Sequence, residues 1–350
     1  MNKKESIIVI VCAYNEEDNI ENCLKSIRHS ILESGSKERF KLVCVDNSSK
    51  DNTWDIVSNF SPNGIKYESL KIEHCQLCVS RNAYKFFPQF DYVAYIDGDG
   101  GVHKHWCKRL MNNIDSSRLD IISGPVLPIT KDGEGNSLWE VFYDSNLRDD
   151  SKYIIGANMC YSAAFLEKID GFPKVFDSRG DETCLLLKAR LLGFEKKINH
   201  FKNLIAYNHF PNDRYQFFME QYTDGISSAQ IKRLWDKSYL SLIILVFRSL
   251  RLLSFISFLF LIPINLNASL LSLVFYIVLS FANMPKFLFR IFKKTLSKSN
   301  SSTIIDGLII LFSFWVFDLG FIRAYLSKLQ FSKDIILSSS KPIIESSYDQ

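Results

Sequence analysis

The sequence predicts an α/β fold with a mainly parallel sheet, followed by an apolar helical region. First, continuous apolar runs alternate with amphipathic segments, as in sheets buried on both faces. Second, each of three such runs ends in a polar cluster, namely YNEE, DNSS or DGDG. Third, the composition changes after about residue 235, beyond which the chain is far more apolar and has few acids.

The predicted elements follow in chain order. We expect strands at IIVIVCA (7–13), KLVCVD (41–46), IKYESLK (65–71) and DYVAYIDGD (91–99). Helices are expected at IENCLKSIRHSILESG (20–35), WDIVSNF (54–60), SRNAYKFF (80–87) and DETCLLLKARLLG (181–193), with a strand-like stretch at DIISGPVLPI (120–129). In parallel sheets ligands bind beyond the carboxyl ends of the strands. The three polar clusters all fall at such ends.

Charge and cysteine content exclude some classes of function. A net charge of +4 over 350 residues is small, and the basic residues gather beside the apolar segments, so we expect no nucleic-acid partner. Only Cys75 and Cys78 form a C-x-x-C pair, and no second pair completes a zinc site. The apolar run near the N-terminus is followed by YNEEDN rather than a cleavage site, so it predicts a buried strand and a cytoplasmic catalytic domain.

Three domains are expected: a catalytic domain at 1–235, a membrane region at 236–330 and a polar tail at 331–350. The membrane region holds two or three hydrophobic helices, at 252–264, 268–282 and 303–322; the preceding LSLIILVF extends the first or lies along the interface. Asp306 and Asp318 in the last segment require a helix end or a bundle interior. The basic stretch 286–298 predicts a cytoplasmic connection.

Single acidic residues in these motifs allow two interpretations. Asp97 and Asp99 form either a solvated turn or a site for a hard cation shared with substrate phosphates. Asp46 and the pair Asp181 and Glu182 are also typical of helix caps and first helical turns. Their order and spacing along the chain distinguish the alternatives.

Seven ordered stretches resemble the family 2 glycosyltransferases, which have the GT-A nucleotide-sugar-binding fold. They are VIVCAYNEEDNI, VCVDNSSKDNT, SRNAYK, YVAYIDGDG, YIIGANMCYSAAFLEKIDGFP, RGDETCLLLKARLLGF, and YNHF followed by EQYTDG. The resemblance covers roughly residues 6–230. It implies a Rossmann-like GT-A domain with C-terminal transmembrane helices.

The resemblance implies roles on the donor side. Ala13, Tyr14 and Glu16 are expected to border the base and ribose, and Asp46 to accept a hydrogen bond from the base. Arg81 is expected near the diphosphate, where a guanidinium suits phosphate geometry. The expected metal ligands are Asp99, as the principal ligand, Asp97, which also lies near the ribose, and His209. The implied cofactor is Mn²⁺ or Mg²⁺, which neutralises the departing nucleoside diphosphate.

Further resemblance concerns the acceptor side. Gly156, Ala157 and Asn158 are expected to line the donor sugar and acceptor. The usual acidic pair of the family is Glu–Asp, with the second acid as the general base; here it is Asp181–Glu182. The reversed order leaves open which of the two deprotonates the acceptor hydroxyl.

We therefore expect an inverting, metal-dependent glycosyltransferase at the cytoplasmic membrane face. Its donor is a nucleotide sugar, most simply a UDP-sugar, and its acceptor a lipid-linked or glycan hydroxyl of cell-surface polysaccharide or glycolipid biosynthesis. The Q-x-x-R-W motif of processive synthases is absent, which favours one sugar per encounter. The alternatives are a polyprenyl-phosphate sugar synthase and a non-catalytic nucleotide-binding membrane protein.

Overall fold

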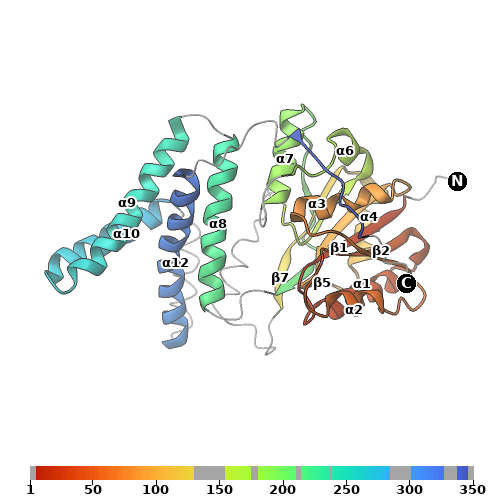
Figure 1. The fold of residues 1–350 in the computed structure, drawn as a ribbon, viewed down its shortest axis with the longest axis horizontal. Helices are drawn as coiled ribbons and strands as arrows, with labels where there is room; N and C mark the ends of the chain where they lie inside the picture. Colours follow the sequence, from red (N-terminus) through yellow and green to blue (C-terminus); the bar gives the residue numbers. More distant parts are fainter. Residues whose placement is uncertain are drawn as a thin grey trace. The chain divides into compact units, whose positions relative to one another are not determined.

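The computed structural model describes residues 5–129, 154–174, 180–209, 214–235, 239–283, 301–326 and 337–345. The chain divides into two compact units. The catalytic unit comprises 1–129, 147–209 and 334–350, and the helical unit comprises 130–146 and 210–333. Figure 1 labels their elements.

The catalytic unit is built on a seven-stranded sheet of order β3-β2-β1-β4-β8-β6-β9. Its strands are β1 Ile7–Ala13, β2 Phe40–Asp46, β3 Lys66–Lys71, β4 Tyr92–Asp97, β6 Ile121–Ser123, β8 Met159–Ser162 and β9 Asn199–His200. β3, β2, β1 and β4 are parallel, whereas β8 runs antiparallel to both β4 and β6. The predicted parallel α/β core is confirmed, and the rest of the sheet is mixed.

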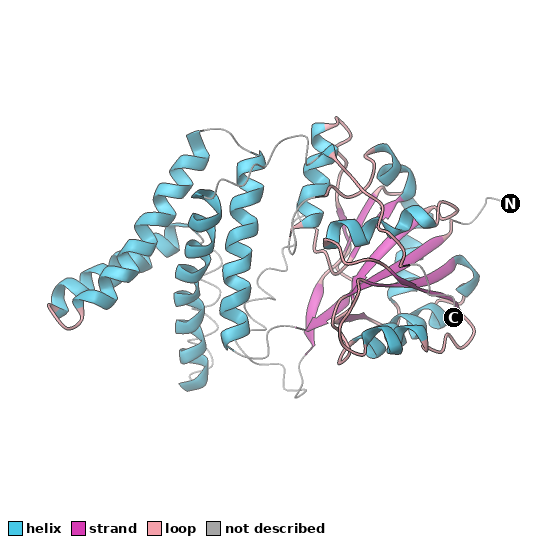
Figure 2. Ribbon diagram, viewed as in Figure 1, coloured by secondary structure: helices cyan, strands magenta, loops and turns pink. Residues whose placement is uncertain are grey.

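Helices cover both faces of this sheet (Figure 2). They are α1 Ile20–Glu33, α2 Thr53–Ser58, α3 Leu77–Arg81, α4 Trp106–Ser117, α6 Ala163–Lys168 and α7 Asp181–Leu191, with short 3₁₀ turns η1 Lys37–Arg39 and η2 Asn82–Phe86. Ile7 and Val9 of β1 pack in one core with α1 and α4, and Ile8 packs in the other with α3 and α6. Because β1 is buried on both faces of the sheet, its sequence is an uninterrupted apolar run.

A second, three-stranded sheet has the order β5-β10-β7. It consists of β5 Gly100–Val102, β7 Val126–Ile129 and β10 Ala206–His209. The expected single strand 120–129 is thus divided into β6 and β7. At the break, a Cβ on Gly124 would lie 2.0 Å from the carbonyl oxygen of Leu204, so only glycine allows this close backbone approach.

The helical unit consists of α8 Arg214–Trp235, α9 Tyr239–Leu261, α10 Leu266–Asn283 and α12 Ser301–Leu326. α8 packs against α12 at two glycines. A Cβ on Gly225 would lie 2.1 Å from the Phe317 carbonyl oxygen, and one on Gly320 would lie 2.2 Å from that of Tyr222. The boundary expected at residue 235 falls at the end of α8, whereas α8 belongs to the helical unit here.

Two of these helices are long and apolar enough to cross a membrane, namely residues 243–261 of α9 and 308–326 of α12. By length and composition alone this is weak evidence, and residues 266–280 of α10 form a shorter apolar helix. α9 joins the expected segment 252–264 to the preceding LSLIILVF as one helix. The basic stretch 286–298 lies outside the described residues.

Candidate active site

The carboxyl ends of three parallel strands bring the predicted site residues to one edge of the sheet. β1 lies between β2 and β4, so that Ala13 is in register with Asp46 and Cys12 with Asp97. Asp99 follows within the turn after β4. This is the edge at which ligands bind in open α/β sheets.

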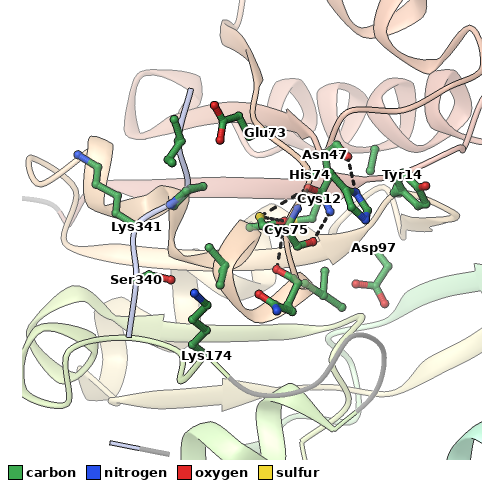
Figure 3. A pocket seen from close by; sticks show the side chains of 18 of the residues that line it. Cys12, Tyr14, Asn47, Glu73, His74, Cys75, Asp97, Lys174, Ser340 and Lys341 are labelled. Atoms are coloured by element: carbon green, nitrogen blue, oxygen red, sulfur yellow. Dashed lines mark hydrogen bonds between the residues drawn. The ribbon is translucent and has the colours of Figure 1, made fainter. Parts of the chain in front are cut away.

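A pocket of about 780 Å³ opens at this edge (Figure 3). Its lining comes from the β1 end, the loop after β3, the turn after β4 and a distant C-terminal stretch. These residues are Cys12, Ala13, Tyr14, Glu16, Asn47, Glu73–Leu77, Val79, Ser80, Asp97–Asp99, Lys174 and Ser340–Ile343. Of the expected nucleotide-binding residues, Ala13, Tyr14, Glu16 and Asp97 line the pocket, whereas Asp46 and Arg81 lie behind its wall.

One end of the pocket offers an aromatic surface beside a buried acid. The rings of Tyr14 and His74 lie 4.8 Å apart. Asp46 is fully buried; its Oδ2 accepts a hydrogen bond from the Ser49 N–H, and its Oδ1 has no hydrogen-bond partner in the described structure. Burial raises the pKa of Asp46, opposed by the Ser49 hydrogen bonds. An unpaired buried acceptor is costly, so Oδ1 is suited to an incoming N–H donor.

Arg81 connects the β4 end to the start of α7. Its guanidinium is 2% exposed, donates to Asp97 Oδ1 at 2.9 Å and pairs with the carboxylate of Asp181. Burial opposes the charge, but Asp181 and Asp97 raise the pKa of Arg81 above its ordinary value. The expected diphosphate contact of Arg81 stays a prediction, because this guanidinium is engaged by two carboxylates here.

The two acids at the start of α7 occupy different environments. Asp181 pairs with Arg81, whereas burial and then the charge of Asp181 raise the pKa of Glu182 to about 8, against the opposing effect of Arg81. A Cβ on Gly156 would lie 3.2 Å from both terminal nitrogens of Arg81 and 3.4 Å from Glu182 Oε2. Gly156 therefore lies close to both Arg81 and Glu182.

Ala157 and Asn158 are buried beside this group. Both N–H groups of the Asn158 amide are used, by the carbonyl oxygens of Pro125 at 3.0 Å and Leu204 at 2.7 Å. Its Oδ1 accepts from Trp106 Nε1 at 3.0 Å. In this structure the side chain joins three protein segments, and its expected contact with sugar or acceptor stays a prediction.

The two remaining predicted metal ligands are neighbours through the backbone. The His209 N–H donates to the Asp99 carbonyl oxygen at 3.2 Å, because β5 and β10 pair beside the DGDG turn. A Cβ on Gly100 would lie 2.6 Å from the Tyr207 carbonyl oxygen, so this approach requires glycine. Carboxylate oxygen and imidazole nitrogen are donors that suit Mn²⁺, and the carboxylate suits Mg²⁺.

Among the described residues, no three His, Cys, Asp or Glu side chains converge to hold a metal alone. A cation at Asp99 would need further oxygen ligands, such as those of a substrate diphosphate. No sequence motif pointed to Lys174 or to Ser340–Ile343 in the pocket lining. All eight cysteines are free thiols, and Cys75 contacts Asn47 and Ser80, so the C-x-x-C is not a disulfide.

Comparisons with known proteins identify a family for part of the chain. Residues 8–170 match the family described as Glycosyl transferase family 2. Glycosyltransferase AglE of Haloferax volcanii is 26% identical over 183 residues, covering 50% of this chain and 58% of AglE. Poly(ribitol-phosphate) beta-glucosyltransferase of Bacillus spizizenii is 24% identical over 169 residues, covering 46% of this chain and 26% of that protein. Each match therefore leaves much of the relative's length uncovered.

Among solved structures, mannosyltransferase PcManGT of Pyrobaculum calidifontis, in complex with GDP-Man and Mn²⁺, has a TM-score of 0.57 at 14% identity. The match covers 94% of this chain and 89% of that chain. This likeness establishes the GT-A fold.

Proposed function

We propose that the chain transfers one sugar from a nucleotide-sugar donor to an acceptor hydroxyl, because residues 8–170 match Glycosyl transferase family 2. The donor is a UDP-sugar in the simplest case, and the acceptor is a lipid-linked or glycan hydroxyl of cell-surface polysaccharide or glycolipid synthesis. The observation that carries this proposal is the Arg81 bridge. It links Asp97, which lines the pocket, to Asp181. The next residue, Glu182, has a carboxyl group of raised pKa.

The donor fits the pocket by its chemistry. The rings of Tyr14 and His74 offer stacking surface for a base, and the unpaired Oδ1 of Asp46 suits an imide N–H behind it. Asp99 and His209 would hold a divalent cation, Mn²⁺ or Mg²⁺. When bound, that cation would neutralise charge on the departing nucleoside diphosphate.

Glu182 is the general base in this proposal, and Asp181 is a positioning residue. Asp181 is engaged by Arg81, whereas the raised pKa of Glu182 gives its carboxylate a higher affinity for a proton. The acceptor oxygen attacks the anomeric carbon opposite the diphosphate, and the bond to the diphosphate oxygen breaks in the same displacement. The hydroxyl proton passes to Glu182, and the anomeric configuration is inverted.

A membrane location follows from the apolar helices of the helical unit. α9 and α12 each contain a stretch long enough to span a bilayer of ~30 Å. The buried Arg248, Arg251 and Asp318 form an ion-paired group within these helices, as intramembrane charges require. We place the catalytic unit at the cytoplasmic face, where nucleotide sugars and lipid-linked acceptors meet.

A panel of nucleotide sugars tests this function. Purified full-length protein with Mn²⁺ should release nucleoside diphosphate from one member faster than from the others, and Asp99→Asn should remove the metal-dependent activity. Offering polyprenyl phosphate as the sole acceptor tests the rival synthase function. A phosphate acceptor needs no deprotonation, so turnover of Glu182→Gln with it would favour the synthase.

A further inference from the structure

The C-terminal stretch 338–345, here called the strap, returns to the catalytic unit almost 150 residues after α7. Its first half is held beside the loop before α7. Ser339 forms an antiparallel bridge with Pro173, the Lys174 N–H donates to the Ser338 carbonyl oxygen at 3.2 Å, and Asn82 Nδ2 donates to that of Ser340 at 2.9 Å. These contacts fix the strap on the α7 side of the pocket.

The second half of the strap is held at the end of β3. The Glu73 N–H donates to the Ile343 carbonyl oxygen at 2.9 Å, and the Glu345 N–H donates to that of Lys71 at 2.9 Å. The Glu345 carboxylate pairs with Lys71 Nζ at 3.1 Å and accepts a hydrogen bond from the Ser48 hydroxyl. Ser48 precedes Ser49, whose N–H bonds Asp46. The strap therefore contacts the loop whose backbone hydrogen-bonds the buried carboxylate of Asp46.

Between its two anchors, the strap passes along the pocket. Ser340–Ile343 all line it, and Pro342 has no N–H that could bond a neighbouring strand. The anchor residues Lys174 and Glu73 line the same pocket, so the strap bridges two parts of its rim (Figure 3). A segment so held forms a wall rather than a loose tail.

Lys174 is the cation that the strap fixes at this rim. Its backbone is bonded to Ser338, its side chain rises toward the pocket in Figure 3, and no carboxylate of the described residues pairs with it. Burial raises the pKa of Cys75 and the charge of Lys174 opposes this, which places the ammonium near that pocket residue. Asp97 and Asp99 repel a diphosphate, and Arg81 is already engaged by two carboxylates. Lys174 can therefore supply positive charge for a diphosphate beside the divalent cation proposed at Asp99.

We propose that the strap is an integral wall of the nucleotide-sugar pocket and that it positions Lys174 to bind the donor diphosphate, in addition to the divalent cation proposed at Asp99. The inference rests on the proposed function, because it takes a nucleotide sugar as the ligand. Lys174 donates charge-assisted hydrogen bonds to phosphate oxygens, and Glu345 is a positioning residue that holds the far end of the strap.

The test is calorimetric binding to the full-length protein with Mn²⁺. UDP, GDP, ADP and CDP are first compared on the wild type, and the diphosphate that binds best is used throughout with its parent nucleoside. The variants are Lys174→Ala, Lys174→Arg and Glu345→Ala, and the control is Lys104→Ala, an exposed lysine outside the pocket lining.

Loss of a charge-assisted hydrogen bond predicts that Lys174→Ala weakens diphosphate binding about tenfold. Its nucleoside affinity should be unchanged, and Lys174→Arg should retain most of the diphosphate affinity. Glu345→Ala should raise the donor KM about fivefold to tenfold with little change in kcat, since one ion-paired anchor is lost. Lys104→Ala should match the wild type.

Hydrogen exchange gives a second measurement that does not depend on activity. Bound diphosphate should protect strap amides in the wild type and protect them less in Glu345→Ala. If the wild type binds none of the diphosphates, the proposed function fails and this inference fails with it. If the wild type binds but Lys174→Ala binds equally well, or Glu345→Ala binds more tightly, the inference alone is overturned.

Discussion

At the scale of single residues, the environment separates two neighbouring acids. Asp181 and Glu182 have almost the same chemistry, but Asp181 pairs with Arg81, whereas burial and the charge of Asp181 raise the pKa of Glu182 to about 8. Environments that push the pKa values of adjacent acids apart often mark acid–base roles. These environments support the proposal that Glu182 is the general base, a question that the Asp–Glu order of the sequence left open.

The pH dependence of turnover tests the role of Glu182. A base of pKa about 8 is mostly protonated at lower pH, so kcat should rise about tenfold per pH unit below 8 and level off above it. Glu182→Gln should remove turnover but bind donor normally. Asp181→Asn removes a neighbouring negative charge, so any remaining activity should have its midpoint at lower pH. A profile that is flat from pH 6 to 9 would exclude this base.

The same group makes a prediction about stability. The folded-state pKa of about 8 lies above the ordinary value of 4.5, so the contribution of Glu182 is complete below pH 4.5 and is lost as pH rises through 8. Glu182→Gln should therefore match the wild-type Tm at pH 5 and exceed it at pH 9. Each kcal/mol corresponds to roughly 2–4 °C for a chain of this size class. Equal Tm differences at both pH values would contradict the assigned pKa.

At the scale of elements, the turn after β4 sets the distance between Asp99 and His209. Gly100 lets β5 lie against β10, where an added Cβ would be 2.6 Å from the Tyr207 carbonyl oxygen. Gly100→Ala should shift this pairing at a cost of about 1–3 kcal/mol. Mn²⁺-dependent turnover should fall more than metal-free nucleotide binding, measured below the Tm of the variant. Equal losses of turnover and of nucleotide binding would instead indicate that the variant is generally misfolded.

Much of this element scale was predictable from the sequence. The strands expected at 7–13, 41–46 and 91–99 were predictable because burial on both sheet faces leaves a mostly apolar run. The strand expected at 65–71 lies at the sheet edge as β3 and is only partly buried, so its sequence is mixed. The division at Gly124 was not, because it depends on a backbone contact with Leu204, eighty residues later. The partners of Arg81 and the position of the strap also depend on long-range contacts, which leave no local periodicity.

At the scale of the whole molecule, the helical unit buries charge among apolar helices. Asp318, fully buried in α12, pairs with Arg248 at 3.0 Å and Arg251 at 2.6 Å on α9. The sequence required a helix end or a bundle interior for Asp318, and the structure buries it and supplies its partners. This group fixes the register of α9 against α12.

Removing the acid tests this description. Asp318→Asn should destabilise the helical unit by about 3–5 kcal/mol, because two buried guanidinium groups lose their counter-ion. Arg323→Gln loses exposed contacts with the hydroxyl and ring of Tyr222 and should cost less than about 1 kcal/mol. Denaturant unfolding in detergent measures both. Similar losses in the two variants would argue against a buried ion-paired group.

The central claim is that a nucleotide sugar bound in the pocket reacts with an acceptor hydroxyl that Glu182 deprotonates. Its most direct test measures nucleoside diphosphate release and donor binding together, for the wild type and Glu182→Gln, with the preferred nucleotide sugar, its acceptor and Mn²⁺. The account predicts that both proteins bind the donor and that only the wild type turns it over. Undiminished turnover by Glu182→Gln, or a wild type that binds no nucleotide sugar, would contradict it.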